Sequence, residues 1–130
     1  DALYLAGLMH DIGKTVLVDF LVKEVHNDKD EVNQLGTDHC AVGELVLSKW
    51  SVIPVITEAV RNHHSNSQDK FRAVVYFANK FAVEDDFEET AEDAAVALGL
   101  PFDDVTNLVA PALKAVGDEE EKIETSEETT

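Results

Sequence analysis

The sequence predicts an all-α protein built from several short helices. Apolar residues recur at intervals of three and four along most of the chain, which is the period of an amphipathic helix. No stretch alternates apolar and polar residues with the two-residue period of a strand. The 130 residues are enough for one folded domain and too few for two independent cores.

The first part of the chain is expected to hold two helices and a polar connection. An apolar run over residues 2–9 predicts the first helix, which we expect to end near Gly13. The apolar stretch 16–25 predicts the second helix. Residues 26–36 are polar and are expected to form a turn or a short helical connection, with His26 in solvent. Because the chain starts at Asp1 next to an apolar run, we expect it to lack the N-terminal helices of a longer domain.

Capping residues and prolines divide the rest of the chain into further helices. Thr37 or Asp38 is expected to cap a helix that includes Trp50, and Pro54 suits the first turn of the next one. Residues 62–69 are expected to form a loop, and 71–82 carry the clearest apolar stripe. After an acidic segment (84–93), helices are predicted over 90–98 and 103–116. We therefore expect a helical domain over 1–117 and an acidic, disordered tail over 118–130.

The charge of the chain is strongly negative and is concentrated in its second half. The net charge is -17, with 11 acids and 8 bases in residues 1–82 but 16 acids and 2 bases in 83–130. This charge opposes binding to nucleic acid and to anionic membranes, whose phosphates attract basic groups. No segment is long and apolar enough to span a bilayer, and no signal peptide is evident. The single cysteine, Cys40, excludes an internal disulfide and is interpreted as a small packed side chain, so we expect a cytoplasmic protein.

Four of the five histidines extend the apolar stripe of a predicted helix, where a polar side chain needs a reason to be buried. They are His10, His39, His63 and His64, and Asp11 adds a carboxylate beside the first. Convergence of three helices on one pocket is the economical explanation. Imidazole and carboxylate ligands suit a divalent transition metal such as iron, manganese, zinc or nickel, among which the sequence does not choose. His39 is expected to stay neutral, because the positive end of its helix disfavours protonation. The alternative is that the histidines bond only to backbone carbonyls and bind no ion.

Residues 7–14 read Gly-Leu-Met-His-Asp-Ile-Gly-Lys and resemble the HDIGK signature of the HD superfamily. Further blocks follow in order: 36–43 (Gly-Thr-Asp-His-Cys-Ala-Val-Gly), Trp50 before Pro54, and 59–64 (Ala-Val-Arg-Asn-His-His). Together they resemble the HDOD family, a signalling-associated branch of that superfamily, across residues 1–82. The resemblance implies an HD-domain-like helical bundle around a histidine-rich pocket. It also implies a place in bacterial signal transduction, where most members are regulatory rather than hydrolytic.

Two departures separate the chain from the catalytic members of the superfamily. Those members are metal-dependent phosphohydrolases, in which the metal polarises phosphoryl oxygens and generates a hydroxide nucleophile. They take a further histidine from an upstream helix, which we expect to be missing here, and a last aspartate from the helix that 71–82 resembles. Asn79 stands at this last position, and its neutral amide oxygen is a poor substitute for a carboxylate. The resemblance therefore implies a degenerate metal site that holds a single ion or none.

Three functions are open at this point. The first is a noncatalytic HDOD-type regulatory module, whose partners are other signalling domains or proteins, including its own upstream part. Its metal ligands would be His10, Asp11, His39, His63 and His64. The second is a metal-dependent phosphohydrolase acting on a nucleotide or phosphoester, with Asp11 and Lys14 as catalytic groups and Lys14 or Arg61 holding the phosphate. The third is a helical bundle whose histidines are structural and bind no ligand.

Overall fold

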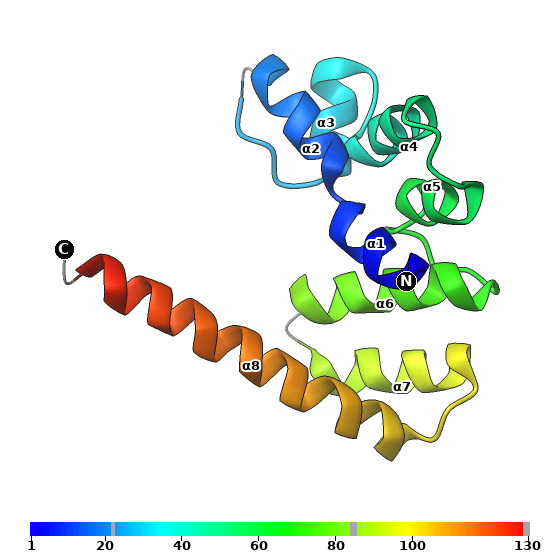
Figure 1. Cartoon of the computed structure of the whole chain (residues 1–130), viewed down its shortest axis with the longest axis vertical. Coiled ribbons are helices and arrows are strands. Elements are labelled where there is room, and N and C mark those ends of the chain that lie inside the picture. Colours follow the sequence, from blue (N-terminus) through cyan, green and yellow to red (C-terminus); the bar gives the residue numbers. More distant parts are fainter. Residues whose placement is uncertain (22, 84–85, 129–130) are drawn as a thin grey trace. The chain divides into compact units, whose positions relative to one another are not determined.

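The fold is all-helical, as the sequence predicts. The structure is a computed structural model that describes residues 1–21, 23–83 and 86–128, and the regular structure in these ranges is helical throughout, with no strand (Figure 1). In chain order the elements are α1 (Ala2–Met9), α2 (Ile12–Leu17), the short 3-10 helix η1 (Val18–Phe20), α3 (Asp28–Leu35), α4 (His39–Lys49), α5 (Pro54–Arg61), α6 (Lys70–Val83), α7 (Phe87–Leu98) and α8 (Phe102–Glu128). In the described ranges, no helix combines the length and the apolar character that a membrane crossing requires.

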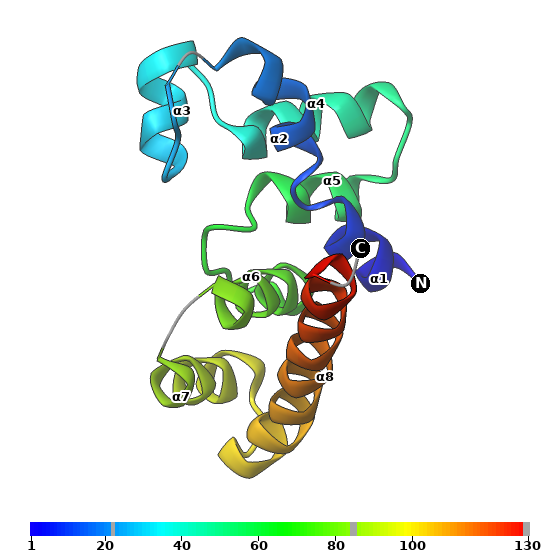
Figure 2. The ribbon, with the colours of Figure 1, turned by 90° about the vertical axis from the view of Figure 1, so that its left-hand side faces the viewer.

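The chain divides into two units, Asp1–Asn79 and Lys80–Thr130. In the first unit, α5 contacts both α1 and α4, and α2 contacts α4 (Figures 1 and 2). Its core consists of buried apolar side chains from α1, α4, α5 and α6. These are Ala6, Leu47, Ile56, Ala59, Val60 and Val75. Burial of each Leu, Ile or Val among them stabilises the unit by about 1.5–3 kcal/mol, so the packed core holds the ends of α1, α4 and α5 in place.

The predicted caps of α4 and α5 are confirmed. Asp38 is the N-cap of α4, and its side chain accepts a hydrogen bond from the backbone N–H of Ala41 at 2.9 Å. Pro54 occupies the first turn of α5, where its missing N–H costs nothing. Both helices therefore start where local sequence signals place them, and the start of α4 brings His39 into the core.

The contact between α2 and α4 depends on Gly13, which the sequence analysis placed at the end of the first helix. That prediction is wrong: Gly13 lies inside α2 and is buried. A Cβ atom there would lie 1.9 Å from the carbonyl oxygen of His39 and 2.9 Å from the backbone nitrogen of Gly43. The glycine is needed because two helix backbones meet at this point, and their approach brings the segment before α2 up to the start of α4.

The prediction of a helix over residues 16–25 is also wrong. The helix begins earlier, at Ile12, and the chain leaves helical geometry after η1, with Leu21 extended at φ -81° and ψ 129°. Residue 22 lies outside the described residues. Val18 and Phe20 are 60% and 65% exposed, so the apolar pattern there does not correspond to a core-facing helix stripe. The short helical connection expected over 26–36 is present as α3, which Asn27 caps.

The second unit pairs α7 with α8. Asp86 caps α7, Gly99 ends it in the left-handed conformation at φ 66°, and Ala91, Ala94 and Val105 are buried. Helix α7 starts at Phe87, three residues before the predicted start, and residues 84–85 of the expected acidic segment lie outside the described residues.

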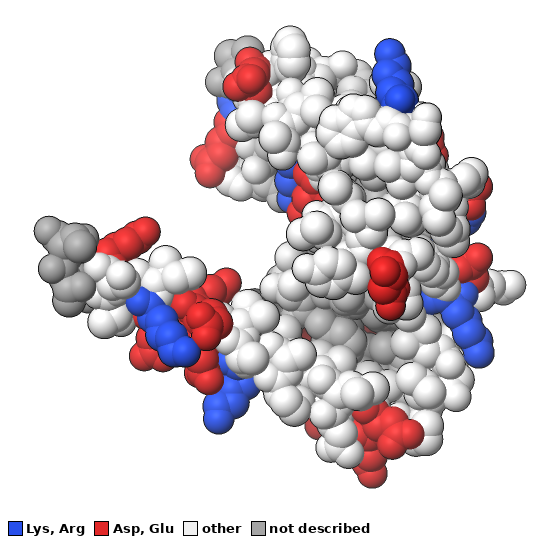
Figure 3. Space-filling view, viewed as in Figure 1, with Lys and Arg blue, Asp and Glu red and all other residues white. Residues whose placement is uncertain are grey.

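The C-terminal segment differs from the disordered tail expected over 118–130. Its described part continues α8 to Glu128, with exposed side chains up to Glu127, and residues 129–130 lie outside the described range. Glu and Lys are good helix formers, and Glu119 pairs with Lys122 one turn later at 2.9 Å. Acidic side chains gather along this part of α8 on the face in Figure 3. The predicted domain boundary at residue 117 stays a prediction.

Candidate metal centre

The structure brings the five predicted ligands together in the first unit. His10 and Asp11 lie between α1 and α2, His39 is the first residue of α4, and His63 and His64 follow α5. The four imidazole rings form a contiguous cluster, with neighbouring ring centroids 4.1–5.1 Å apart. His39 is 1% exposed and His63 is 0% exposed, so the centre of the cluster is closed to solvent.

Backbone carbonyls orient two of the rings. Nδ1 of His10 lies 2.6 Å from the carbonyl oxygen of Gly7, and Nδ1 of His63 lies 2.6 Å from that of Val60. A carbonyl oxygen only accepts, so in each ring Nδ1 carries the hydrogen and donates it. The Nε2 atom of each neutral ring is then left with a lone pair that can bind a metal ion.

Carboxylates from α3 orient the other two rings. Nδ1 of His39 lies 2.6 Å from Oε1 of Glu31, which also accepts from the backbone N–H of His39 at 3.1 Å. Nδ1 of His64 lies 2.5 Å from Oδ2 of Asp28. Here too the hydrogen lies on Nδ1, and Nε2 is the available ligand atom. A carboxylate behind a histidine is the usual arrangement around protein-bound metals, because it fixes the ring and makes it a better ligand.

Three ligand atoms meet at the centre of the cluster. Nε2 of His39 lies 3.1 Å from Nε2 of His63, and Oδ1 of Asp11 lies 3.3 Å from each of them. Two atoms that each lie about 2.0–2.1 Å from one ion are separated by roughly 2.8–3.4 Å at octahedral to tetrahedral angles. Oδ1 is a buried atom that no hydrogen-bond donor of the described residues reaches in suitable geometry. The three atoms therefore fit one divalent ion, and that ion would satisfy the buried oxygen.

The second carboxylate oxygen of Asp11 faces the rim of the cluster. Oδ2 lies 3.2 Å from Nε2 of His10 and 3.6 Å from Nζ of Lys14, whose side chain is 57% exposed. His10, followed by His39 and His63, lowers the pKa of Asp11 far below its usual range. Asp11 is therefore an anion under all ordinary conditions, as a metal ligand must be.

Without a metal, the cluster holds protons. Burial disfavours the charged ring of His39, but hydrogen bonds to Asp11, Cys40 and Glu31 outweigh burial and raise its pKa to about 11. For His63, burial is outweighed in the same way, and its pKa rises to about 9. The expectation that the helix end keeps His39 neutral is therefore wrong for the metal-free chain, because the hydrogen bonds to Asp11, Cys40 and Glu31 favour the charged ring. A metal ion has to displace these protons.

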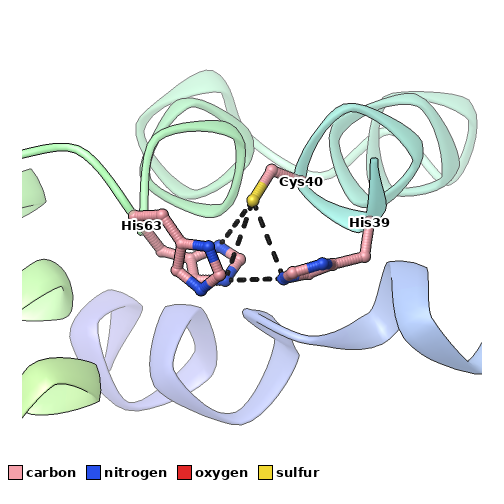
Figure 4. A group of neighbouring side chains, drawn as sticks. His39, Cys40 and His63 are labelled. Carbon is pink, nitrogen blue, oxygen red and sulfur yellow. Dashed lines mark hydrogen bonds between the residues drawn. The ribbon is translucent and has the colours of Figure 1, made fainter. Parts of the chain in front are cut away.

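Sequence reasoning missed three residues of the cluster, namely Asp28, Glu31 and Cys40. Glu31 is 3% exposed. Such burial is unusual for an acid, and the polar sequence around it predicts an exposed segment. The i, i+3 spacing of the two acids on α3 was the one available signal, and it is common on surface helices. Sγ of Cys40 lies 3.7 Å from Nε2 of His39 and 3.8 Å from Nε2 of His63 (Figure 4).

Two of the predicted residues do not join the cluster. Arg61 is exposed in the last turn of α5, and Asn79 is half-buried in α6. In the part of the chain that the structure describes, neither one forms a hydrogen bond or an ion pair with a ligand of the cluster. Lys14 is the one predicted phosphate-binding residue that the structure places next to a ligand.

Comparison with known proteins gives one family-level match. The family model of the HDOD domain matches residues 1–66, about half of the chain. The matched stretch contains every residue of the cluster described above. No curated protein and no solved structure matches the chain.

Proposed function

The chain belongs to the HDOD domain family, and on this premise we propose that it is a cytoplasmic regulatory module of bacterial signal transduction that binds one metal ion and hydrolyses no phosphoester. One observation carries the proposal: the buried Oδ1 of Asp11 lies 3.3 Å from Nε2 of both His39 and His63. These three atoms have the spacing and the chemistry of ligands to one divalent transition metal.

A metal ion at this position would connect three parts of the first unit. Asp11 precedes α2, His39 begins α4 and His63 follows α5, so an ion bound to all three would fix these helices to one another. The free energy of metal binding then becomes folding free energy of the unit. A module that is rigid when loaded and looser when empty is suited to regulation, because a partner can distinguish the two states.

The scarcity of free carboxylates supports the noncatalytic reading. Among the residues that the structure describes, Asp11 is the one acid whose oxygens face the histidine Nε2 atoms, because Asp28 and Glu31 lie behind the rings at Nδ1. A dinuclear hydrolase site needs further carboxylates to hold a second ion. At the position where the resemblance calls for one, the chain has Asn79, whose neutral amide oxygen binds such ions poorly.

Hydrolysis is the second candidate, and Lys14 favours it. The Nζ atom lies 3.6 Å from Oδ2 of Asp11 and is open to solvent, so a phosphate bound to the metal would meet a cation beside it. In this reading Asp11 and Lys14 are the catalytic groups. Arg61 would have to reach the same phosphate from the exposed end of α5.

The proposed partners are other signalling domains or proteins. Large apolar side chains remain exposed on the first unit, among them Tyr4 and Leu8 at 74% and 66%, one turn apart on α1. Nucleic acid and anionic membranes are unsuitable partners for a chain with a net charge of -17.

Metal analysis followed by an activity assay separates these functions. The purified chain is analysed for bound metal, loaded with zinc, manganese, iron or nickel, and incubated with a panel of nucleotides and phosphoesters. The proposed module binds metal and gives no turnover. Turnover that Asp11→Ala abolishes and the exposed control Asp19→Ala retains establishes the hydrolase instead. If the purified chain contains no metal and His63→Ala loses its helical structure, the histidines have a structural role.

A further inference from the structure

The thiol of Cys40 lies inside the cluster, although the sequence suggests an ordinary packed cysteine. Cys40 is the second residue of α4 and is 3% exposed. Its Sγ atom faces the rings of His39 and His63 from the place where α4 and α5 lie close together (Figure 4). The thiol therefore lies within reach of two imidazole nitrogens, and it also lies 4.0 Å from Oδ2 of Asp28.

The distances fit a shared ion. A metal with a thiolate ligand at about 2.3 Å and imidazole ligands at about 2.0–2.1 Å has sulfur and nitrogen roughly 3.6 Å apart at the tetrahedral angle. The observed separations from Sγ to Nε2 are 3.7 Å for His39 and 3.8 Å for His63. The two Nε2 atoms, 3.1 Å apart, complete one face of such a site.

His64 supplies a fourth donor. One ligand atom from each of His39, Cys40, His63 and His64 can be chosen so that all four lie within 4.8 Å of one another. Because Asp28 accepts the Nδ1 hydrogen of His64, Nε2 of this ring is also left as a lone pair. One thiolate with three imidazoles is a complete four-coordinate set for a structural zinc ion.

In neutral rings, the lone pairs of the buried Nε2 atoms need a hydrogen-bond donor or a cation. His39 and His63 both use Nδ1 to donate, to Glu31 and to a backbone carbonyl, so neither neutral ring has a hydrogen on the Nε2 atom that faces Sγ. A single S–H group can satisfy only one of these two nitrogens, so the metal-free cluster has to take up a proton to avoid a costly unpaired nitrogen in a closed site. One divalent cation between Sγ and both nitrogens satisfies all three atoms.

We propose that Cys40 is a metal ligand, and that its thiolate with His39, His63 and His64 gives the site a preference for a thiophilic, four-coordinate ion such as Zn²⁺ over Mn²⁺ or Mg²⁺. This inference rests on the proposed function, because the ion uses two of the same histidines. The thiol proton and the protons held by the imidazole cluster pass to solvent as the ion binds, and no atom changes its oxidation state. Asp11 faces the same two nitrogens and is available to the same ion as a second anionic ligand.

Titration of the whole chain with Co²⁺ tests the proposal. Cobalt replaces zinc in such sites, and a thiolate ligand adds a sulfur-to-cobalt charge-transfer band in the near ultraviolet beside the strong visible bands of four-coordinate cobalt. The chain contains one cysteine and one methionine, so Cys40 and Met9 are its only sulfur atoms. We expect the near-ultraviolet band in the natural chain and in Met9→Leu, and its loss in Cys40→Ser.

Zinc and manganese affinities provide the second readout. In Cys40→Ser the zinc affinity should fall on the order of 100-fold, because loss of even an outer-shell partner lowers metal affinity by about 10–100-fold. The manganese affinity should change little. Should Cys40→Ser fail to fold by circular dichroism, the band in the natural chain and in Met9→Leu decides the question. Cobalt bound through His39 without a thiolate band overturns the inference and leaves the metal-binding module intact. Absence of cobalt binding overturns both.

Discussion

Nε2 of His39 and Nε2 of His63 face each other across 3.1 Å, although His39 begins α4, His63 follows α5 and the two lie 24 positions apart. Both rings donate their Nδ1 hydrogen elsewhere, so two neutral rings would direct lone pairs at each other. The arrangement is stable only with a positive charge between the nitrogens. A proton supplies it in the metal-free chain, and we propose that a metal ion supplies it in the loaded chain.

Metal binding should therefore release protons. The pKa values of His39 and His63 in the metal-free chain are about 11 and about 9, so at pH 7 the cluster is protonated and a metal must displace protons to bind. The zinc affinity is expected to rise as the pH increases from 6 towards 9. Calorimetric titration in buffers of different ionisation enthalpy measures the number of protons released. We expect at least one at pH 7, and a value of zero contradicts the protonated cluster.

The stability of the metal-free chain should depend on pH in the opposite sense. The folded-state pKa values of His39 and His63 lie above the ordinary value of 6.5. Their contribution to stability is therefore fully present below pH 6.5 and is lost as the pH rises through about 9 and then about 11. Thermal unfolding in the presence of a chelator should show a melting temperature that falls between pH 7 and pH 10. A melting temperature that stays constant or rises over this range contradicts the assignment.

Glu31 should control metal affinity without touching the metal. Glu31→Gln keeps the shape of the side chain but removes the charge behind His39, and loss of such a partner typically lowers metal affinity about 10–100-fold. The matched control is Glu58→Gln, which removes an exposed acid paired with Arg72 at 2.7 Å outside the cluster. Zinc titrations of both variants provide the comparison. Equal affinities in the two variants would show that Glu31 does not position the ligand.

The helix contact at Gly13 should be indispensable for the site. Gly13→Ala places a Cβ atom 1.9 Å from the carbonyl oxygen of His39, so the two helix backbones must separate. We expect a loss of about 3 kcal/mol or more in unfolding free energy, the upper end of what overpacking costs, together with weaker metal binding. Gly7→Ala is the matched control, because nothing lies within 4 Å of its Cβ position and alanine favours a helix by about 0.5–1 kcal/mol. Denaturant unfolding of both variants checks the pair, and similar stabilities would contradict the close contact.

A carboxylate at position 79 should strengthen binding of a second ion, as the family resemblance implies. Asn79→Asp is expected to raise the metal content above that of the natural chain, because a carboxylate replaces a neutral amide. Asn107→Asp adds the same charge on an exposed residue of α8 and serves as the control. Metal content measured after loading and dialysis decides the outcome, and equal contents in the two variants count against the role given to Asn79.

The parts of this structure that the sequence predicts are those with local causes. Asp38 caps α4 through its own backbone neighbours, and Pro54 starts α5 because its ring fits only the first turn. Helical periodicity also predicts the burial of His39 on α4, whereas His63 and His64 lie beyond the end of α5 and His64 is exposed. A local signal can also mislead. The sequence around Gly13 suggests the end of a helix, but a glycine is needed there because the backbone of α4, about 30 residues away in sequence, leaves no room for a Cβ atom.

The parts that escaped prediction depend on contacts between distant segments. Nothing near Glu31 indicates burial, because its partner His39 reaches it only after the turn at Gly36 brings α4 back against α3. In the sequence, Cys40 looks like a small packed residue. It becomes a candidate ligand only because the fold places His63, which follows α5, next to its thiol. The prediction of a neutral His39 ring fails for the same reason. Asp11 and Glu31, which lie in two other segments of the chain, contact the ring and favour its charged form.

Zinc titration of the natural chain, of His39→Gln and of His26→Gln tests the central claim most directly. His26 is the histidine outside the cluster, exposed before α3, and its substitution removes an imidazole without touching the site. We predict one zinc ion per chain in the natural protein and in His26→Gln, and loss of this binding in His39→Gln, which stays helical by circular dichroism. A natural chain that binds no zinc, or a His39→Gln variant that binds it as well as His26→Gln does, contradicts the claim.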